Sequence, residues 1–203
     1  MNGYAILGWG SLLWDLDDLA PHVRGPWRVR AGPALPMEFT RISPKRKHGL
    51  VVCLDADHGV LCQTHAIASV RGEIDGASED LARRERAPRR MIGSVCLRTG
   101  AAAGRSEGVI GAVSAWCAAQ GWAGAVWTDL ESNFTEFQGE AFTIAGATGY
   151  LQSLSGDSLD EAVQYIENAP AETDTPLRRA LARETWWLAE ARRLGVPRQA
   201  GTE

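Results

Sequence analysis

Two short stretches of the sequence hold residues whose types and spacing could do chemistry. The first is GWGSLLWD at residues 8–15, where two glycines and a serine interrupt an otherwise apolar segment. Such an interruption after a buried strand predicts a tight turn whose backbone N–H groups can hold a small anionic group. The second is SEDLARRERAPRR at residues 78–90, where Glu85 follows Leu81 and Ala82 at helical spacing.

The second stretch predicts a short amphipathic helix. Ser78 can cap its N-terminus, and Pro88 would end it. Positions 78, 81, 82 and 85 share one helix face, and Leu81 and Ala82 make that face the buried one. Glu85 is therefore the one carboxylate expected to point inward. Arginines are expected to take mostly the other sides of the helix, at positions 83, 84 and 86.

Two interpretations of Glu85 stay open from the residues alone. It can be an edge residue that pairs with Arg89, one helical turn further on. It can instead be a partly desolvated carboxylate, which would suit it to general acid–base catalysis. Basic residues at 41–47 and 83–90 could attract an anion, although solvated faces explain them more simply. Among them Arg41 stands out, because it lies inside an expected strand.

A dinucleotide site is an alternative interpretation of the first stretch. Gly8 and Gly10 supply the first two glycines of the G-x-G-x-x-G pattern, but Leu13 occupies the third position, where a small residue is needed for close helix packing. Arg28 and Arg30 lie near the expected place of a 2′-phosphate partner. The chain downstream does not alternate strands and helices, so this interpretation is weak.

Two further kinds of site fit the spacing poorly. A serine-hydrolase elbow needs glycine two residues before and after its nucleophile, whereas Trp9 and Leu13 flank Ser11. A metal site could draw on Cys53, His58, Cys62 and His65. Cys62 and His65 lie three residues apart within one expected strand, so they would point to opposite faces. Buried thiols and ordinary histidines are the simpler interpretation, and no metal is expected.

Strands are expected to dominate the first half of the chain. Apolar or alternating segments predict them at residues 3–9, 34–43, 48–54, 59–69, 92–98 and 124–130. The segments 48–54 and 59–69 flank a short turn-forming link and predict a hairpin. Residues 15–27 are expected to form a polar loop or short helix, 101–108 a flexible loop and 198–203 a tail.

Helices are expected near the C-terminus. A capping box at residues 158–161 opens the first of them. Thr175 and Pro176 can begin a second helix, over about 177–194, which ends at Gly195. Together these elements predict an α+β fold with a mixed or barrel-like sheet rather than regular βαβ alternation.

Composition limits the class of protein. The 203 residues, 45% of them hydrophobic, suffice for a single domain over 1–203, with a core at about 3–155 and a helical appendage at about 158–195. The net charge of −4 gives no indication of general affinity for nucleic acid. No apolar run reaches the roughly 18 residues of a membrane span. Four scattered cysteines and no export signal favour a cytoplasmic protein with reduced thiols.

The strand followed by GWGSLLW, taken with the Leu-x-x-x-Glu of a short helix, resembles the γ-glutamylcyclotransferase-like superfamily. The opening motif there is typically Tyr-Gly-Ser, followed in the glutathione-degrading ChaC-type branch by Leu and an apolar pair ending in Trp. Residues 9–14 resemble that branch, although Trp9 stands where the family usually has Tyr. The family's catalytic glutamate follows a leucine in a short helix, the place that Glu85 takes after Leu81. The resemblance covers roughly residues 3–99, and the Gly-Tyr often found after the glutamate is absent.

The resemblance implies a small mixed β-barrel of the γ-glutamylcyclotransferase-like type with flanking helices and a helical C-terminal extension. It implies that the α-amine of a γ-glutamyl group, in glutathione, a γ-glutamyl peptide or a γ-glutamyl amine, attacks its own γ-carbonyl and releases 5-oxoproline. Glu85 would act as catalytic acid and base. Substrate-binding residues are expected at Trp9, Gly10, Ser11 and Leu12, with Arg41 as a further candidate.

The same resemblance implies no cofactor and no metal, and net charge and hydropathy predict no nucleic-acid and no membrane partner. The chain would act as a monomer or a homodimer on a small γ-glutamyl substrate. A non-catalytic protein that binds a small ligand on the same fold is the alternative. An NADP-binding oxidoreductase is a weaker one.

Overall fold

The computed structural model of the chain describes residues 2–196, so the expected tail at 198–203 lies outside the described residues. The chain divides into two compact units. Unit 1 is Met1–Leu35 with Gln63–Leu130, and unit 2 is Pro36–Cys62 with Glu131–Glu203. Three strands from the first half of the sequence lie wholly or mostly in unit 2, together with the C-terminal helices.

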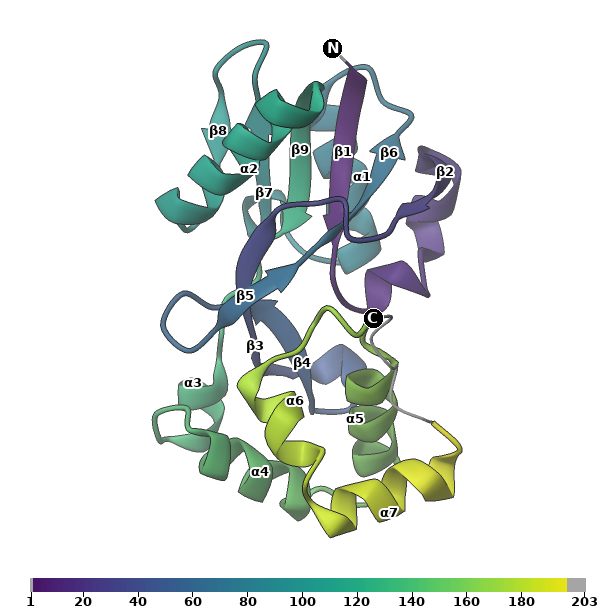
Figure 1. Cartoon of the computed structure of the whole chain (residues 1–203), viewed down its shortest axis with the longest axis vertical. Helices are drawn as coiled ribbons and strands as arrows, with labels where there is room; N and C mark the ends of the chain where they lie inside the picture. Colours follow the sequence, from purple (N-terminus) through teal and green to yellow (C-terminus); the bar gives the residue numbers. More distant parts are fainter. Residues whose placement is uncertain (1, 197–203) are drawn as a thin grey trace. The chain divides into compact units, whose positions relative to one another are not determined.

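Unit 1 is built on a mixed six-stranded sheet (Figure 1). Its strands are β1 (Asn2–Gly8), β2 (Val23–Arg28), β6 (His65–Ser69), β7 (Ile92–Cys96), β8 (Ala102–Ala103) and β9 (Trp122–Thr128). They lie in the order β2-β6-β1-β9-β7-β8. The central pair β1 and β9 is parallel, and the other neighbours for which the register is defined are antiparallel.

Helices cover both faces of this sheet. Unit 1 contains the 3-10 helices η1 (Ser11–Leu13), η2 (Asp17–His22) and η4 (Arg89–Met91), and the α-helices α1 (Ile74–Glu85) and α2 (Glu107–Gln120). In Figure 1, α2 lies in front of the sheet and α1 behind it. Both pack against β7 and β9, and α1 also packs against β1.

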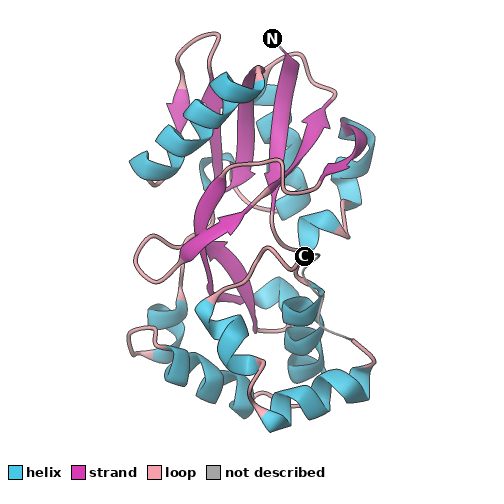
Figure 2. Ribbon diagram, in the orientation of Figure 1, coloured by secondary structure: helices cyan, strands magenta, loops and turns pink. Residues whose placement is uncertain are grey.

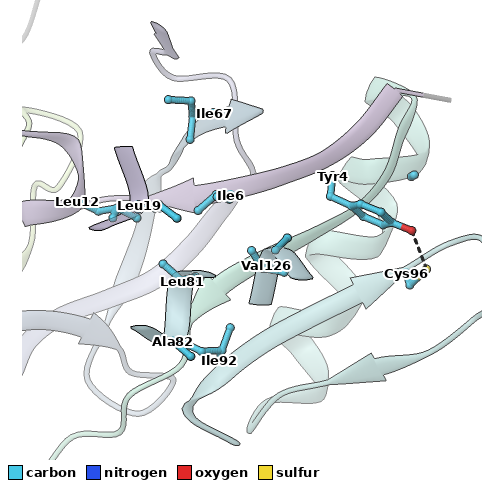
Figure 3. Close-up of a cluster of buried hydrophobic side chains, with 12 residues drawn as sticks. Tyr4, Ile6, Leu12, Leu19, Ile67, Leu81, Ala82, Ile92, Cys96 and Val126 are labelled. Carbon is cyan, nitrogen blue, oxygen red and sulfur yellow. Dashed lines mark hydrogen bonds between the residues drawn. The ribbon is translucent and has the colours of Figure 1, made fainter. Parts of the chain in front are cut away.

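The core between α1 and the sheet is apolar and tightly closed (Figure 3). Ile6, Leu81 and Val126 are each fully buried, and Leu12 and Ile92 complete the contact at the same end. Burying side chains of this size stabilises the fold by about 1.5–3 kcal/mol each. Leu81 therefore fixes how α1 is rotated about its axis, and with it the direction of Glu85.

Unit 2 combines a small sheet with helices (Figure 2). The sheet has the order β4-β3-β5, and most of its residues belong to this unit. Its strands are β3 (Ala34–Ser43), β4 (Gly49–Leu54) and β5 (Val60–Gln63). The helices are η3 (Pro44–Arg46), α3 (Phe134–Gln138), α4 (Ile144–Ser153), α5 (Gly156–Asn168), α6 (Pro176–Leu181) and α7 (Thr185–Leu194). Helix α5 packs against β4, α7 against α5, and α6 against α4.

A buried carboxylate joins β3 to the start of α6 in unit 2. Glu38 is fully buried and accepts hydrogen bonds from the backbone N–H groups of Phe39, at 2.7 Å, and Leu177, at 3.1 Å. The Thr175 side chain, which accepts from Arg178 N, also hydrogen-bonds Glu38. Burial raises the pKa of the Glu38 carboxyl above its ordinary value, and these hydrogen bonds only partly oppose the rise.

The prediction of a hairpin between 48–54 and 59–69 is wrong. Strands β4 and β5 lie on opposite sides of β3 and do not pair with each other. Gly59 makes this possible, because a Cβ there would lie 2.7 Å from the Met37 backbone nitrogen and would hold the chain away from β3. The Asp55 side chain fixes the link by accepting from Asp57 N at 3.0 Å and His58 N at 2.9 Å.

The single strand expected over 59–69 is also wrong, because it breaks at Thr64 into β5 and β6, which belong to different sheets. Thr64 N donates to Pro33 O at 3.2 Å, and Gly32 N donates to Thr64 O at 3.0 Å. A Cβ on Gly32 would lie 2.1 Å from the Thr64 hydroxyl oxygen. The crossing of two chain segments at this point therefore depends on glycine and ends the strand.

Several helix boundaries differ from expectation. Helix α1 begins at Ile74, so Ser78 is not its cap but a buried residue within it. The expected helix over 177–194 is broken into α6 and α7 by a turn at residues 182–184. The expected cap Thr175 is confirmed, since its side chain accepts from Arg178 N at 3.3 Å. The helix predicted from the capping box starts earlier, at Gly156.

Other elements were not expected. Part of the predicted loop 101–108 is the short strand β8, and Ser106 caps the unpredicted helix α2. Strand β2 and helices α3 and α4 also had no counterpart in the expectations. The α+β fold is confirmed. The barrel is wrong, because over residues 2–196 the six-stranded sheet is open, with β2 and the two-residue β8 at its edges. None of the helices in this range combines the length and apolar character needed to span a bilayer.

Candidate functional site

The ends of three elements of unit 1 meet around Glu85. The parallel strands β1 and β9 run in register, with Ile6 opposite Val126, and end at Gly8 and Thr128. Helix α1 packs against both strands and ends at Glu85. Ligand sites in sheets with parallel strands are commonly found beyond the carboxyl ends of those strands. The structure places residues 8–15 and the end of the 78–90 stretch here.

The turn after β1 depends on Gly8. A Cβ at this position would lie 2.7 Å from Cη2 of Trp27, so only glycine lets the indole pack here without displacement. The chain then forms η1, in which Leu13 N donates to Gly10 O at 3.0 Å and Trp14 N to Ser11 O at 3.2 Å. The N–H groups of Gly10, Ser11 and Leu12 precede the first of these hydrogen bonds, as at the start of any helix.

The side chains of the predicted binding residues 9–12 do not all face outward. Trp9 and Leu12 are each only 5% exposed, and Leu12 belongs to the core of unit 1 (Figure 3). Ser11 is half-buried and its hydroxyl takes part in the hydrogen bonding described below. Trp9 and Leu12 therefore hold the turn in place, and contacts from them to a ligand would come from the backbone.

Glu85 points inward as predicted, but it is not the one buried carboxylate of α1, because Asp80 is only 2% exposed and is bound by Arg71 at 2.6 Å. The Glu85 side chain is 13% exposed, and Leu81 and Ala82 on the same helix face are buried. The helix stops immediately after it, because Arg86 adopts the left-handed conformation, with φ of 53°. Ala87 N then donates to Ala82 O at 3.1 Å and closes the helix end.

The expected pairing of Glu85 with Arg89 is wrong. Arg89 donates to Ile92 O at 3.1 Å and lies 3.7 Å from Asp75. The partner of Glu85 is Arg84, whose Nη1 donates to Glu85 Oε1 at 2.8 Å. The reason lies in the end of the helix, since Arg86 leaves the helical path one residue after Glu85 and Arg89 never reaches the next turn.

Arg84 was expected on an outer side of the helix and is instead buried, with 2% of its side chain exposed. Its Nη2 donates to the Asp15 carbonyl at 2.5 Å and to the Ser11 hydroxyl at 3.4 Å. One guanidinium therefore joins the candidate acid–base residue to the turn at Ser11, 73 residues away in the sequence. Its planar fork of donors suits it to bridging separate acceptors.

A second group fixes the same carboxylate oxygen. The Thr128 hydroxyl, at the end of β9, donates to Glu85 Oε1 at 3.3 Å. Arg84 and Thr128 thus converge on Oε1, and no residue within the described part of the chain donates a hydrogen bond to Oε2. The arrangement can hold the carboxylate by one oxygen while the other exchanges a proton.

Arg41, the remaining predicted binding residue, belongs to unit 2. Its Nη1 donates to the Glu131 carbonyl at 2.6 Å, which secures the segment that follows β9 to strand β3 within that unit. Sequence analysis did not find Arg84 or Thr128. No periodicity could have indicated them, because their partners come from distant segments of the chain.

The residues considered for a metal site are dispersed. Cys62 and His65 lie on β5 and β6, and not on one strand as expected. His58 Nδ1 lies 3.3 Å from the Asp55 carboxylate, and burial raises the pKa of the Cys62 thiol to about 11. Among residues 2–196 no group of three or more His, Cys, Asp or Glu side chains is placed to hold a metal ion.

The first stretch also lacks the geometry of a dinucleotide site. Gly8 and Gly10 lead into the 3-10 helices η1 and η2 and then into strand β2. A pyrophosphate site of the G-x-G-x-x-G type needs an α-helix whose N-terminus begins at this turn. That helix is not formed here.

Comparisons of the chain with protein-family models, with curated proteins and with solved structures each found no match. A function for this chain therefore has to be argued from the geometry of unit 1 and from the motifs in its sequence.

Proposed function

We propose that the chain is a γ-glutamylcyclotransferase-like enzyme, with Glu85 as acid and base and the turn at residues 9–12 as the substrate-binding loop. The observation that carries the proposal is the guanidinium of Arg84, which hydrogen-bonds both the Glu85 carboxylate and the turn at Ser11. Two motifs that are far apart in the sequence, and that resemble those of one family, are thus joined by direct contacts. A chance resemblance in either motif gives no reason for that contact.

The substrate of this proposal is a small γ-glutamyl amide. Its own α-amine is the nucleophile, so the protein has mainly to hold the glutamyl chain curled with the amine close to the γ-carbonyl carbon. Backbone N–H groups of Gly10, Ser11 and Leu12 can donate to the substrate carboxylate or to the oxyanion that forms on the γ-carbonyl oxygen. The chemistry needs no cofactor and no metal.

The proton transfers balance without water. Glu85 takes a proton from the α-ammonium group, and the free amine attacks the γ-carbonyl carbon to give a tetrahedral intermediate. Glu85 gives this first proton to the leaving nitrogen, and the bond between carbon and that nitrogen breaks as the carbonyl re-forms. The attacking nitrogen, which became positively charged on attack, gives a second proton to Glu85, and Glu85 passes it to the departing amine. In net, two protons pass from the attacking nitrogen to the leaving nitrogen, which departs as an ammonium group. The other product is 5-oxoproline, and Glu85 returns to its starting form.

The test is a mass-spectrometric screen for 5-oxoproline after incubation of the whole chain with glutathione, γ-glutamyl amino acids and γ-glutamyl amines. We expect at least one class to give many equivalents of 5-oxoproline per protein. The class that reacts would identify the leaving amine. Absence of release from all three classes, by protein shown to be folded, would reject the proposal.

The ion pair between Arg84 and Glu85 also favours one alternative, a non-catalytic protein that binds a small carboxylate at the same site. Glu85 is already engaged by Arg84 at 2.8 Å, as in many purely structural pairs. In that case γ-glutamyl compounds would raise the melting temperature without forming 5-oxoproline. Release of 5-oxoproline beyond one equivalent per chain excludes this alternative.

A further inference from the structure

We propose that Arg84 is a positioning residue that fixes Glu85 by Oε1 and ties it to the Ser11 turn, leaving Oε2 as the oxygen that exchanges protons with the substrate. The inference rests on the proposed function for its chemistry. The physical link between α1 and the turn can be tested without it.

The contact between Arg84 and Glu85 is unusual for neighbours in a helix. Side chains of adjacent helical residues diverge by about 100°, so they do not normally face each other. Here both side chains turn toward the ends of β1 and β9, where Arg84 meets Ser11 and Asp15 and Glu85 meets Thr128. The Arg84–Glu85 pair is held by groups outside the helix, so its geometry depends on the position of the Ser11 turn.

Burial shows how much this placement requires. Burying a cation that is only 2% exposed is costly unless it is paired and hydrogen-bonded. Nη1 and Nη2 of Arg84 are hydrogen-bonded, while its Nε has no hydrogen-bond partner in the described structure. The chain contains a second buried arginine for comparison. Arg178 in unit 2 is also 2% exposed, and its Nη atoms donate to four backbone carbonyls, those of Glu167, Ala169, Pro170 and Thr173. These Nη atoms of Arg178 thus reach backbone carbonyls, whereas those of Arg84 are divided between the turn and one carboxylate.

The division of donors has a consequence for the reaction. Arg84 and Thr128 both occupy Oε1, at 2.8 Å and 3.3 Å, so rotation of the carboxylate would cost both hydrogen bonds. A proton that passes from the attacking to the leaving nitrogen would therefore use Oε2. Arg84 itself carries no proton in the reaction, because a guanidinium stays charged throughout the ordinary pH range.

Other charged groups near α1 do not share this contact. The elements packed against α1 carry the titratable groups Tyr4, Asp17, Asp18, His22, Arg89, Arg90 and Cys96. Asp17 lies 3.5 Å from Arg86, and His22 lies 3.7 Å from Asp80, which Arg71 also binds. Of the charged groups on α1 and on these elements, only Arg84 hydrogen-bonds Glu85 in the described structure.

The first arm of the test is kinetic and uses Arg84→Met, Arg84→Lys and the matched control Arg83→Met on the exposed side of α1. We expect kcat for 5-oxoproline release to fall roughly 10- to 100-fold in both Arg84 variants, with KM within about threefold of wild type. Unchanged kcat, or a lower kcat accompanied by an equally large rise in KM in Arg84→Met, would overturn the inference.

The second arm needs no activity. Hydrogen–deuterium exchange of peptides covering residues 9–15 should be faster in Arg84→Met than in wild type and in Arg83→Met, because the turn loses its tie to α1. Equal exchange in the two methionine variants would overturn the link. If Arg84→Met fails to fold, Arg84→Lys provides the comparison. If wild-type protein gives no 5-oxoproline, the proposed function fails, and the exchange result still decides whether Arg84 couples the two segments.

Discussion

The buried carboxylate of Glu38 makes a quantitative prediction about pH. Its pKa is raised in the folded protein by burial, so the folded state holds its proton more tightly than the unfolded state does. The stability that this proton contributes is fully present below the unfolded pKa, near 4.5, and is lost as the pH rises toward the folded pKa. Substitution Glu38→Gln removes the titration while leaving a side chain of the same shape.

The size of the effect follows from proton linkage. Between the two pKa values the free energy of unfolding of the wild type should fall, relative to Glu38→Gln, by up to about 1.4 kcal/mol per pH unit. The backbone N–H groups of Phe39 and Leu177 donate to different oxygens of Glu38, and glutamine keeps an acceptor for only one of them. The substitution therefore changes the free energy of unfolding by an amount that does not depend on pH. The test is the slope, against pH, of the difference in free energy of unfolding between the wild type and Glu38→Gln.

Urea titrations from pH 4 to 8, followed by circular dichroism, give the measurement. The exposed Glu140→Gln in the same unit is the matched control and should run parallel to wild type. Parallel curves for wild type and Glu38→Gln would refute the claim that burial raises the pKa of Glu38.

Two further predictions concern the support of the site in unit 1. Leu81→Ala, at a fully buried position that orients α1, should lower the free energy of unfolding by about 2–5 kcal/mol, whereas Glu79→Ala on the exposed face should change it by less than about 0.5 kcal/mol, both measured by urea titration. Equal effects would contradict the orientation of α1. Ser106→Ala removes the side-chain acceptor of Val109 N at the start of α2 and should cost about 1 kcal/mol by the same assay, with no loss meaning that the cap is dispensable.

The parts of the fold that could be predicted are those specified by local signals. Strand β3 was predicted with both ends correct, from its alternating pattern, and Thr175 was predicted as a cap from its place before Pro176. The break at Thr64 could not be predicted, since it depends on the approach of Gly32 from another segment. Strand pairing failed for the same reason, because β4 and β5 use the two edges of a strand that precedes both in the sequence.

The candidate site shows the same limit. The inward direction of Glu85 followed from helical spacing with Leu81 and Ala82, and the structure confirms it. The partner of Glu85 could not be predicted, because the polarity of Arg84 led to the prediction that it lies on an exposed side of the helix. A buried arginine has no apolar pattern, and its acceptors, at Ser11 and Asp15, become neighbours only when β1 and α1 pack together.

The most direct test of the central claim compares 5-oxoproline release by Glu85→Gln and Glu79→Gln on whichever γ-glutamyl compound reacts with the wild type. Both variants lose one carboxylate from α1, and glutamine at position 85 keeps an acceptor for Arg84. The account predicts that Glu79→Gln retains the wild-type rate, while Glu85→Gln loses at least about two orders of magnitude with its circular dichroism spectrum unchanged. Turnover by Glu85→Gln within a few-fold of wild type would contradict the account.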